Sequence, residues 1–217
     1  MPSVTALKAT RRGHVALHVD DAFVAAVTDA FVVRHGLFVG RELSDAQLAR
    51  LVAAAGAERT LADAYRLLAH RARSCAELAQ RLRAKGHDPT VVTDVVERLT
   101  AEGLLDDRAF AAAFVADKRR LGGWGAGRIA RELARLGVAD TVAQAALARA
   151  GAESDEDDES ARALQVLTRR GPARAPLDAA RKRAYDHLLR RGYDPTVAYR
   201  AVGEWSAGGA GDETVTD

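Results

Sequence analysis

The chain has 217 residues, of which 48% are hydrophobic and only 5% aromatic, so its core is expected to consist mainly of Ala, Leu and Val side chains in closely packed helices. No apolar stretch approaches the roughly 20 residues that a transmembrane helix needs, and the first residues lack the pattern of a secretory signal. The single cysteine, Cys75, excludes an internal disulfide, and we expect a cytoplasmic protein with no membrane partner.

The net charge of +2 conceals an uneven distribution. The run 155–159 is wholly acidic, and the C-terminal tail adds further carboxylates, so the rest of the chain is strongly basic. A basic body of this kind suits a polyanion or an acidic protein face. The plain alternative is that the arginines only solvate helix surfaces.

The first 56 residues predict a small mixed appendage. Apolar residues alternate over 15–19, a turn signal follows at Asp20-Asp21, and residues 23–27 are mostly apolar, a pattern typical of a β-hairpin. Residues 4–8 are expected to add an edge strand.

A helix is predicted after the hairpin. Ser44 and Gln47 have the spacing of a capping box, in which each side chain bonds the other residue's backbone N–H. The helix is expected to run from Asp45 to about Ala55, with Gly56 as its C-terminal stop.

The rest of the chain contains a motif that occurs three times, with Leu four residues before a glycine and Thr-Val four and five residues after it. The glycines, Gly86, Gly137 and Gly192, are 51 and 55 residues apart. Internal repetition of this length is typical of stacked helical units. We expect each glycine to have a positive φ and to end the middle helix of its unit.

We therefore predict a mainly α-helical protein with three tandem three-helix repeats, helix-turn-helix-like, in an elongated array. Asp88-Pro89 and Asp194-Pro195 are expected to cap the third helix of repeats 1 and 3, with Ala139-Asp140 in the equivalent place of repeat 2. The predicted segments are an appendage at 1–56, repeat 1 at 57–106, repeat 2 at 107–153, an acidic linker at 154–160, repeat 3 at 161–206 and a disordered tail at 207–217.

The acidic linker has two interpretations. Five adjacent carboxylates repel one another, so the run is expected to be exposed and could act as a hinge between repeats 2 and 3. Alternatively, it is the solvated N-terminus of a helix, where acidic side chains suit the helix dipole.

No catalytic constellation is apparent. The Gly-rich segment 122–127 lacks the Gly-Lys-Ser/Thr ending of a P-loop and has no preceding strand, so a helix-to-helix turn is expected there. The six histidines are scattered, and Cys75 is expected to be structural. We expect no enzyme activity, no cofactor and no metal site.

Basic residues recur at helical spacing in all three repeats and predict a continuous basic strip if the repeats stack regularly. Such a strip would bind a phosphate backbone or an acidic protein groove. Its candidate residues are Arg81 and Lys85 in repeat 1, Lys118, Arg119, Arg120, Arg128, Arg131 and Arg135 in repeat 2, and Arg183, Arg190 and Arg191 in repeat 3.

Four segments together resemble the regulatory protein RecX family. They are Arg73-Ser74-Cys75-Ala76-Glu77-Leu78, Leu82-Arg83-Ala84-Lys85-Gly86, the stretch 103–111 (GLLDDRAFA) and the stretch 127–138 (GRIARELARLGV). The likeness covers residues 58–150 well and 159–205 more loosely. Two features depart from it: Leu136 interrupts the basic strip where the other repeats have Lys85 and Arg191, and the acidic run is unusual.

The resemblance implies a non-catalytic modulator of the RecA recombinase, with roles in homologous recombination, DNA repair and the SOS response. Such a monomer would lie along the groove of the RecA–single-stranded-DNA filament and inhibit ATP hydrolysis, strand exchange and coprotease activity. Direct contact with single- or double-stranded DNA stays open.

The alternative interpretation is a DNA-binding transcriptional regulator, because three-helix units resemble helix-turn-helix modules. Against it, no dimerisation element is recognisable, and the third helix of repeat 1 begins with Pro89-Thr90-Val91-Val92, which is largely apolar.

Overall fold

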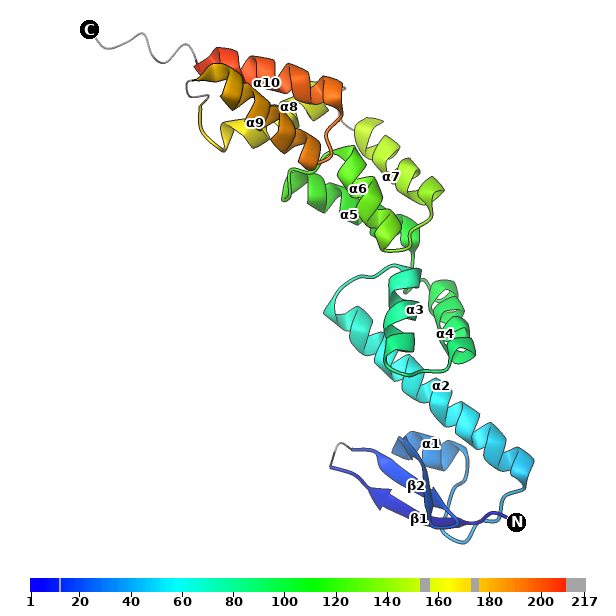
Figure 1. Cartoon of the computed structure of the whole chain (residues 1–217). Coiled ribbons are helices and arrows are strands. Elements are labelled where there is room, and N and C mark those ends of the chain that lie inside the picture. The colour runs from blue at the N-terminus through cyan, green and yellow to red at the C-terminus, as the bar shows by residue number, and fades with distance from the viewer. Residues whose placement is uncertain (12, 153–156, 173–175, 210–217) are drawn as a thin grey trace. The chain divides into compact units, whose positions relative to one another are not determined.

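The computed structural model describes residues 1–11, 13–152, 157–172 and 176–209, and it divides into two compact units, Met1–Leu105 and Asp106–Asp217 (Figure 1). Each unit has its own apolar cores. Within the described ranges, no helix combines the length and apolar character needed to cross a membrane.

Unit 1 begins with a three-stranded antiparallel sheet in the order β1-β2-β3 (Figure 1). Its strands are β1 (Val4–Ala9), β2 (Val15–Val19) and β3 (Ala22–Val27). Asp20 and Asp21 have φ of 48° and 62°, the left-handed pair that a tight two-residue hairpin turn requires. The predicted hairpin and edge strand are confirmed. A short helix, α1 (Asp29–Arg34), follows and buries Phe31 in the same core as Leu17.

The predicted end of the next helix at Gly56 is wrong, because α2 runs without a break over Asp45–His70. Its start is as expected: Ser44 and Gln47 form the reciprocal capping box. A glycine inside a helix costs only about 1 kcal/mol relative to alanine. Burial of Ala55 and Ala64 on either side of Gly56 offsets this cost, so α2 is shared by the appendage and repeat 1.

Repeat 1 is completed by α3 (Cys75–Ala84) and α4 (Pro89–Ala101). Ser74 accepts a hydrogen bond from the Glu77 N–H, and Asp88 caps α4 by accepting from the Thr90 N–H at 2.8 Å. The core of the repeat contains Leu78, Leu82, Val92 and Leu99, all fully buried.

Unit 2 contains repeats 2 and 3. Repeat 2 consists of α5 (Asp107–Arg120), α6 (Ala126–Arg135) and α7 (Asp140–Ala152), and repeat 3 of α8 (Asp157–Thr168), α9 (Leu177–Arg190) and α10 (Pro195–Gly209). Helix α8 thus begins inside the predicted acidic linker, which corrects that boundary, and residues 153–156 lie outside the described part. Helix α10 extends into the predicted disordered tail, whose remainder, 210–217, is also outside it.

The three landmark glycines behave as predicted. Gly86, Gly137 and Gly192 have φ of 82°, 76° and 83° and follow the ends of α3, α6 and α9. Each begins the same C-terminal motif, in which the next residue's N–H bonds the carbonyl of the buried leucine four residues before the glycine. These bonds run from His87 to Leu82, from Val138 to Leu133 and from Tyr193 to Leu188, at 3.3, 3.0 and 3.2 Å.

The Gly-rich segment 122–127 is a helix-to-helix turn, as expected, and it also joins repeat 2 to repeat 3. The N–H groups of Gly125 and Gly127 donate to the carbonyls of Arg191 and Gly192 at 2.9 and 3.0 Å. A Cβ on Gly192 would lie 2.2 Å from the backbone nitrogen of Arg128. Glycines at these positions therefore allow two backbones to meet, which is how the end of α9 packs on the start of α6.

Candidate basic interface

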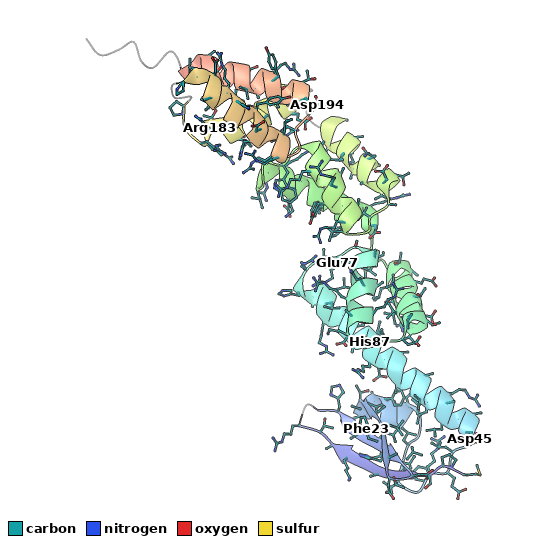
Figure 2. The ribbon with its side chains drawn as sticks, viewed as in Figure 1. Phe23, Asp45, Glu77, His87, Arg183 and Asp194 are labelled. Atoms are coloured by element: carbon teal, nitrogen blue, oxygen red, sulfur yellow. The ribbon has the colours of Figure 1, made fainter. Side chains whose placement is uncertain are left out.

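In repeat 1, Arg81 is exposed but pairs with a buried carboxylate, that of Glu77 at the start of α3. Figure 2 labels Glu77. The Nε of Arg81 donates to Oε1 of Glu77 at 2.9 Å, and the same oxygen accepts from Arg71 and Arg73 at 2.5 Å each. Burial alone would raise the pKa of Glu77, but the hydrogen bonds from Arg81 and Arg71 hold it below its usual value. Arg81 is therefore paired within the fold, but one carboxylate serves three guanidiniums, so the group keeps a net positive charge.

Lys85 is also paired with a carboxylate inside the fold, that of Asp63. Its Nζ lies 3.3 Å from Oδ1 of Asp63 on α2, and the other carboxylate oxygen of Asp63 lies 2.7 Å from Nε2 of the buried His87. Burial would raise the pKa of Asp63, but its hydrogen bonds to His87 and Lys85 lower it. The two acids, Glu77 and Asp63, make repeat 1 less basic than its helical pattern indicates.

In repeat 2, the three predicted arginines of α6 have different environments. The Arg128 guanidinium lies 4.0 Å from the centre of the Trp124 ring, in cation–π geometry. Arg131 is exposed, and Arg135 pairs with Glu132 at 2.5 Å. That hydrogen bond lowers the pKa of Glu132, against a smaller opposing effect of burial. The predicted positive face of α6 is thus interrupted by one carboxylate.

The three basic residues at the end of α5 also diverge. Lys118 places its Nζ 5.0 Å from the centre of the Trp124 ring and 5.1 Å from that of Phe114. Arg119 is half-buried and donates to the carbonyl oxygen of Leu147 on α7 at 3.4 Å. Arg120 is exposed, 3.9 Å from a carboxylate oxygen of Asp117 on its own helix.

In repeat 3, Arg183 (labelled in Figure 2) and Arg190 are exposed on α9, whereas Arg191 is half-buried. The Nη1 of Arg191 donates to the carbonyl oxygens of Gly122 and Gly123, and its Nε lies 2.9 Å from Nε2 of His187. Arg191 thus contributes to the junction between repeats 2 and 3 as well as to its charge.

The junction brings together predicted residues that are far apart in sequence. The cationic groups of Lys118 and Arg128 both lie over the ring of Trp124, and Arg191 donates to a carbonyl oxygen of the same turn. Sequence reasoning missed Trp124, whose position between basic helix ends in a Gly-rich turn was the available signal. It also missed Arg170, whose Nη1 lies 2.8 Å from Nδ1 of His187. The predicted residues of repeat 1, Arg81 and Lys85, belong to unit 1, whereas this cluster belongs to unit 2.

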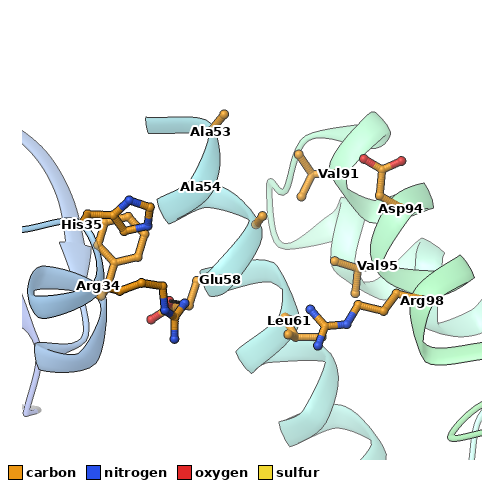
Figure 3. Close-up of a pocket in the computed structure, with 12 residues that line it drawn as sticks. Arg34, His35, Ala53, Ala54, Glu58, Leu61, Val91, Asp94, Val95 and Arg98 are labelled. Carbon is orange, nitrogen blue, oxygen red and sulfur yellow. Dashed lines mark ion pairs between the residues drawn. The ribbon is translucent and has the colours of Figure 1, made fainter. Parts of the chain in front are cut away.

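Unit 1 contains a separate groove of about 760 Å³ beside α1, α2 and α4 (Figure 3). Its lining is mostly apolar, with Leu61 and Val95 among its members, and an Arg34–Glu58 ion pair of 3.6 Å lies on one side. None of the predicted strip residues line it.

The described residues contain no group of three or more His, Cys, Asp or Glu placed to hold a metal ion. The guanidiniums and the ammonium group can bind anions, and the Trp124 ring holds two of these cations. Nothing in this set of side chains provides an activated nucleophile.

Comparison with known proteins identifies what the chain is similar to. Two family models match it: RecX, first three-helix domain, over residues 61–99, and RecX, second three-helix domain, over residues 106–147.

Curated relatives and solved structures agree with these matches. The regulatory protein RecX of Halorhodospira halophila is 42% identical over 142 residues, which cover 65% of this chain and 84% of that protein. The RecX of Mycobacterium sp. (strain KMS) is 37% identical, with 67% and 80% covered, and that of Geobacillus kaustophilus is 34% identical, with 73% and 58% covered. The match therefore spans little more than half of the Geobacillus protein.

A crystal structure of regulatory protein RecX superposes with a TM-score of 0.65 at 18% identity, covering 94% of this chain and all of that one. The crystal structure of RecX from Lactobacillus salivarius gives 0.60 at 16% identity, covering 70% and 97%. At these identities the structures support the fold alone.

Proposed function

This chain belongs to the RecX family of regulatory proteins, and we propose that it binds the RecA–single-stranded-DNA filament and inhibits RecA ATP hydrolysis, strand exchange and coprotease activity. It would do so as a cytoplasmic monomer and without catalysis of its own. The proposal would place the protein in the regulation of homologous recombination, DNA repair and the SOS response.

The observation that carries the proposal is the cluster of basic groups on unit 2 of a RecX-family chain. Lys118, Arg128 and Arg191 meet at the 122–127 turn, and Arg131 is exposed on α6 nearby in sequence. A RecA filament presents both DNA phosphates and protein surface, so cationic side chains backed by an aromatic ring suit it. Affinity should consequently fall steeply as salt concentration rises.

The alternative, a helix-turn-helix transcriptional regulator, predicts a different partner. A recognition helix reads base edges through side chains such as Arg, Asn or Gln in its first turns. Helix α4 begins with Pro89, Thr90 and Val91, which favours the filament proposal. A preference for one duplex sequence of more than about a thousandfold over random DNA would favour the alternative.

The direct test is the DNA-dependent ATPase of RecA, measured with and without this protein at stoichiometric ratios. We expect inhibition that grows with the protein-to-RecA ratio. A triple variant, Arg128→Glu, Arg131→Glu and Arg135→Glu, should inhibit less, and a control triple at exposed arginines elsewhere, Arg50→Glu, Arg59→Glu and Arg200→Glu, should inhibit as the parent does. An unchanged ATPase rate with the parent protein would refute the proposal.

A further inference from the structure

Unit 2 contains a basic cavity of about 220 Å³ between the 122–127 turn and the C-terminal ends of α8 and α9. Its charged or titratable lining residues are Arg169, Arg170, His187 and Arg191. Within the residues that the structure describes, neither this lining nor the charges that shift His187 include a carboxylate. The cavity therefore differs from the basic positions of repeat 1, where Glu77 and Asp63 pair with the cations.

Each of the two ring nitrogens of His187 is contacted by a guanidinium. Nη1 of Arg170 lies 2.8 Å from its Nδ1, and Nε of Arg191 lies 2.9 Å from its Nε2. Burial and the positive charges of Arg170, Arg191 and Arg190 lower the pKa of His187 to about 4, so the ring is neutral at neutral pH. A neutral imidazole has one acceptor nitrogen and one N–H. One of the two guanidiniums must therefore direct an N–H toward the N–H of the imidazole ring. An oxyanion bound in the cavity would accept hydrogen bonds from both of these N–H groups.

A favourable interaction with helix dipoles does not by itself explain why these basic residues gather at the cavity. Basic residues are common at helix C-termini, where they interact favourably with the last carbonyls. The last carbonyls of α9, those of His187, Leu188 and Leu189, however, already accept from the backbone N–H groups that follow the helix. Arg191 is itself held in place by the carbonyls of the turn, which fixes one donor at the cavity before any ligand arrives.

We propose that this cavity is a phosphate-binding site, and that its ligand is the phosphodiester backbone of a nucleic acid. The oxygens of a tetrahedral phosphate point in several directions, so a phosphate can accept at the same time from guanidiniums that approach from the ends of two different helices. Arg169 and Arg170 are exposed at the cavity, so a continuous backbone has access to it. This site does not depend on RecA, and it stands or fails separately from the function proposed above.

The site can be tested with inorganic phosphate and the full-length protein. The imidazole ¹H–¹⁵N signals of His187 should shift saturably when phosphate replaces chloride at constant ionic strength, and the pKa of His187 should rise. Arg170→Gln should weaken phosphate binding about tenfold or more, as expected for the loss of a charge-assisted hydrogen bond. Arg200→Gln on α10 removes the same charge from an exposed position outside the cavity and should bind phosphate like the parent.

Tryptophan fluorescence verifies that both variants are folded, because Trp124 and Trp205, the two tryptophans of the chain, lie in unit 2. The site is refuted if phosphate shifts the His187 signals no more than chloride does, or if the two variants weaken binding equally.

The source of the phosphate is tested with a single-stranded oligothymidylate in the absence of RecA. We expect the oligonucleotide to displace inorganic phosphate from His187 and to lose affinity in Arg170→Gln but not in Arg200→Gln. Displacement by polyglutamate with the same dependence on Arg170 would overturn the choice of phosphate over carboxylate. If phosphate binds and the oligonucleotide does not displace it, the nucleic-acid assignment is wrong and the site binds free phosphate groups.

Discussion

Two glycines with the same backbone conformation should respond differently to substitution. A Cβ on Gly86 would meet nothing within 4 Å, so Gly86→Val should cost only the strain of a β-branched residue at positive φ, above about 1 kcal/mol. Gly192→Ala should cost more, because its Cβ would also overlap the backbone of Arg128. Tryptophan fluorescence during urea unfolding reports on unit 2, and far-UV circular dichroism adds unit 1. Equal losses for the two variants would contradict the close backbone approach at Gly192.

The lowered pKa of His187 predicts that the stability of unit 2 depends on pH. This pKa is lowered from 6.5 to about 4 by burial and by the neighbouring arginines, so between these values the unfolded chain binds more protons than the folded one. Stability should therefore fall as pH decreases from about 6.5 toward about 4 and then change little further through this residue. His187→Gln should reduce that fall, measured as the difference between the urea midpoints of variant and parent across the range. Parallel pH profiles would show that the histidine does not titrate as described.

The carboxylates that pair with the basic residues of the candidate site could not be predicted from the sequence. The spacing of basic residues predicted a positive face on the helices, but it did not reveal the carboxylates that pair with these residues. Asp63 lies 22 residues from Lys85 on another helix, and only the packing of α2 against α3 brings them together. Glu132 lies within the predicted strip itself, yet its pairing with Arg135 depends on side-chain direction along α6.

At the scale of single helices, α6 should separate charge from structure. Arg131 is exposed, so Arg131→Glu should weaken RecA inhibition while leaving the thermal midpoint nearly unchanged, since surface substitutions cost within about 0.5 kcal/mol. Arg128→Glu should lower the midpoint as well, because it removes the cation–π contact with Trp124, worth roughly 0.5–2 kcal/mol. Circular dichroism melting and the RecA ATPase measure the two effects. Full inhibition by Arg131→Glu would remove this residue from the interface.

Helix boundaries were predictable where a local signal determined them. The capping residues Ser44, Asp88 and Asp194 and the three landmark glycines act within one turn of chain, and the structure has helix ends at each. The error at Gly56 arose because a glycine ends a helix only when the chain turns away there. Burial along α2 continues on both sides of Gly56, and that tertiary contribution is absent from a local pattern.

At the scale of the whole molecule, the chain should unfold as two units. Unit 1 has its cores around Leu17 and Leu82, and unit 2 around Leu133 and Leu188. Leu133→Ala should destabilise unit 2 by about 2–5 kcal/mol, the usual cost of truncating a fully buried leucine. The loss should include repeat 3, because the Gly125–Arg191 and Gly127–Gly192 hydrogen bonds join the two repeats.

Hydrogen exchange measures this prediction element by element, because each amide reports the opening that exposes it. In Leu133→Ala, amides of α6 and α9 should exchange faster to the same degree, while those of α4 keep the protection of the parent. The converse variant, Leu82→Ala, should leave the tryptophan fluorescence transition unchanged. Faster exchange in α4 of Leu133→Ala would show that the units unfold together. Protection retained in α9 would show that the Gly-rich turn holds repeats 2 and 3 in contact without coupling their stability.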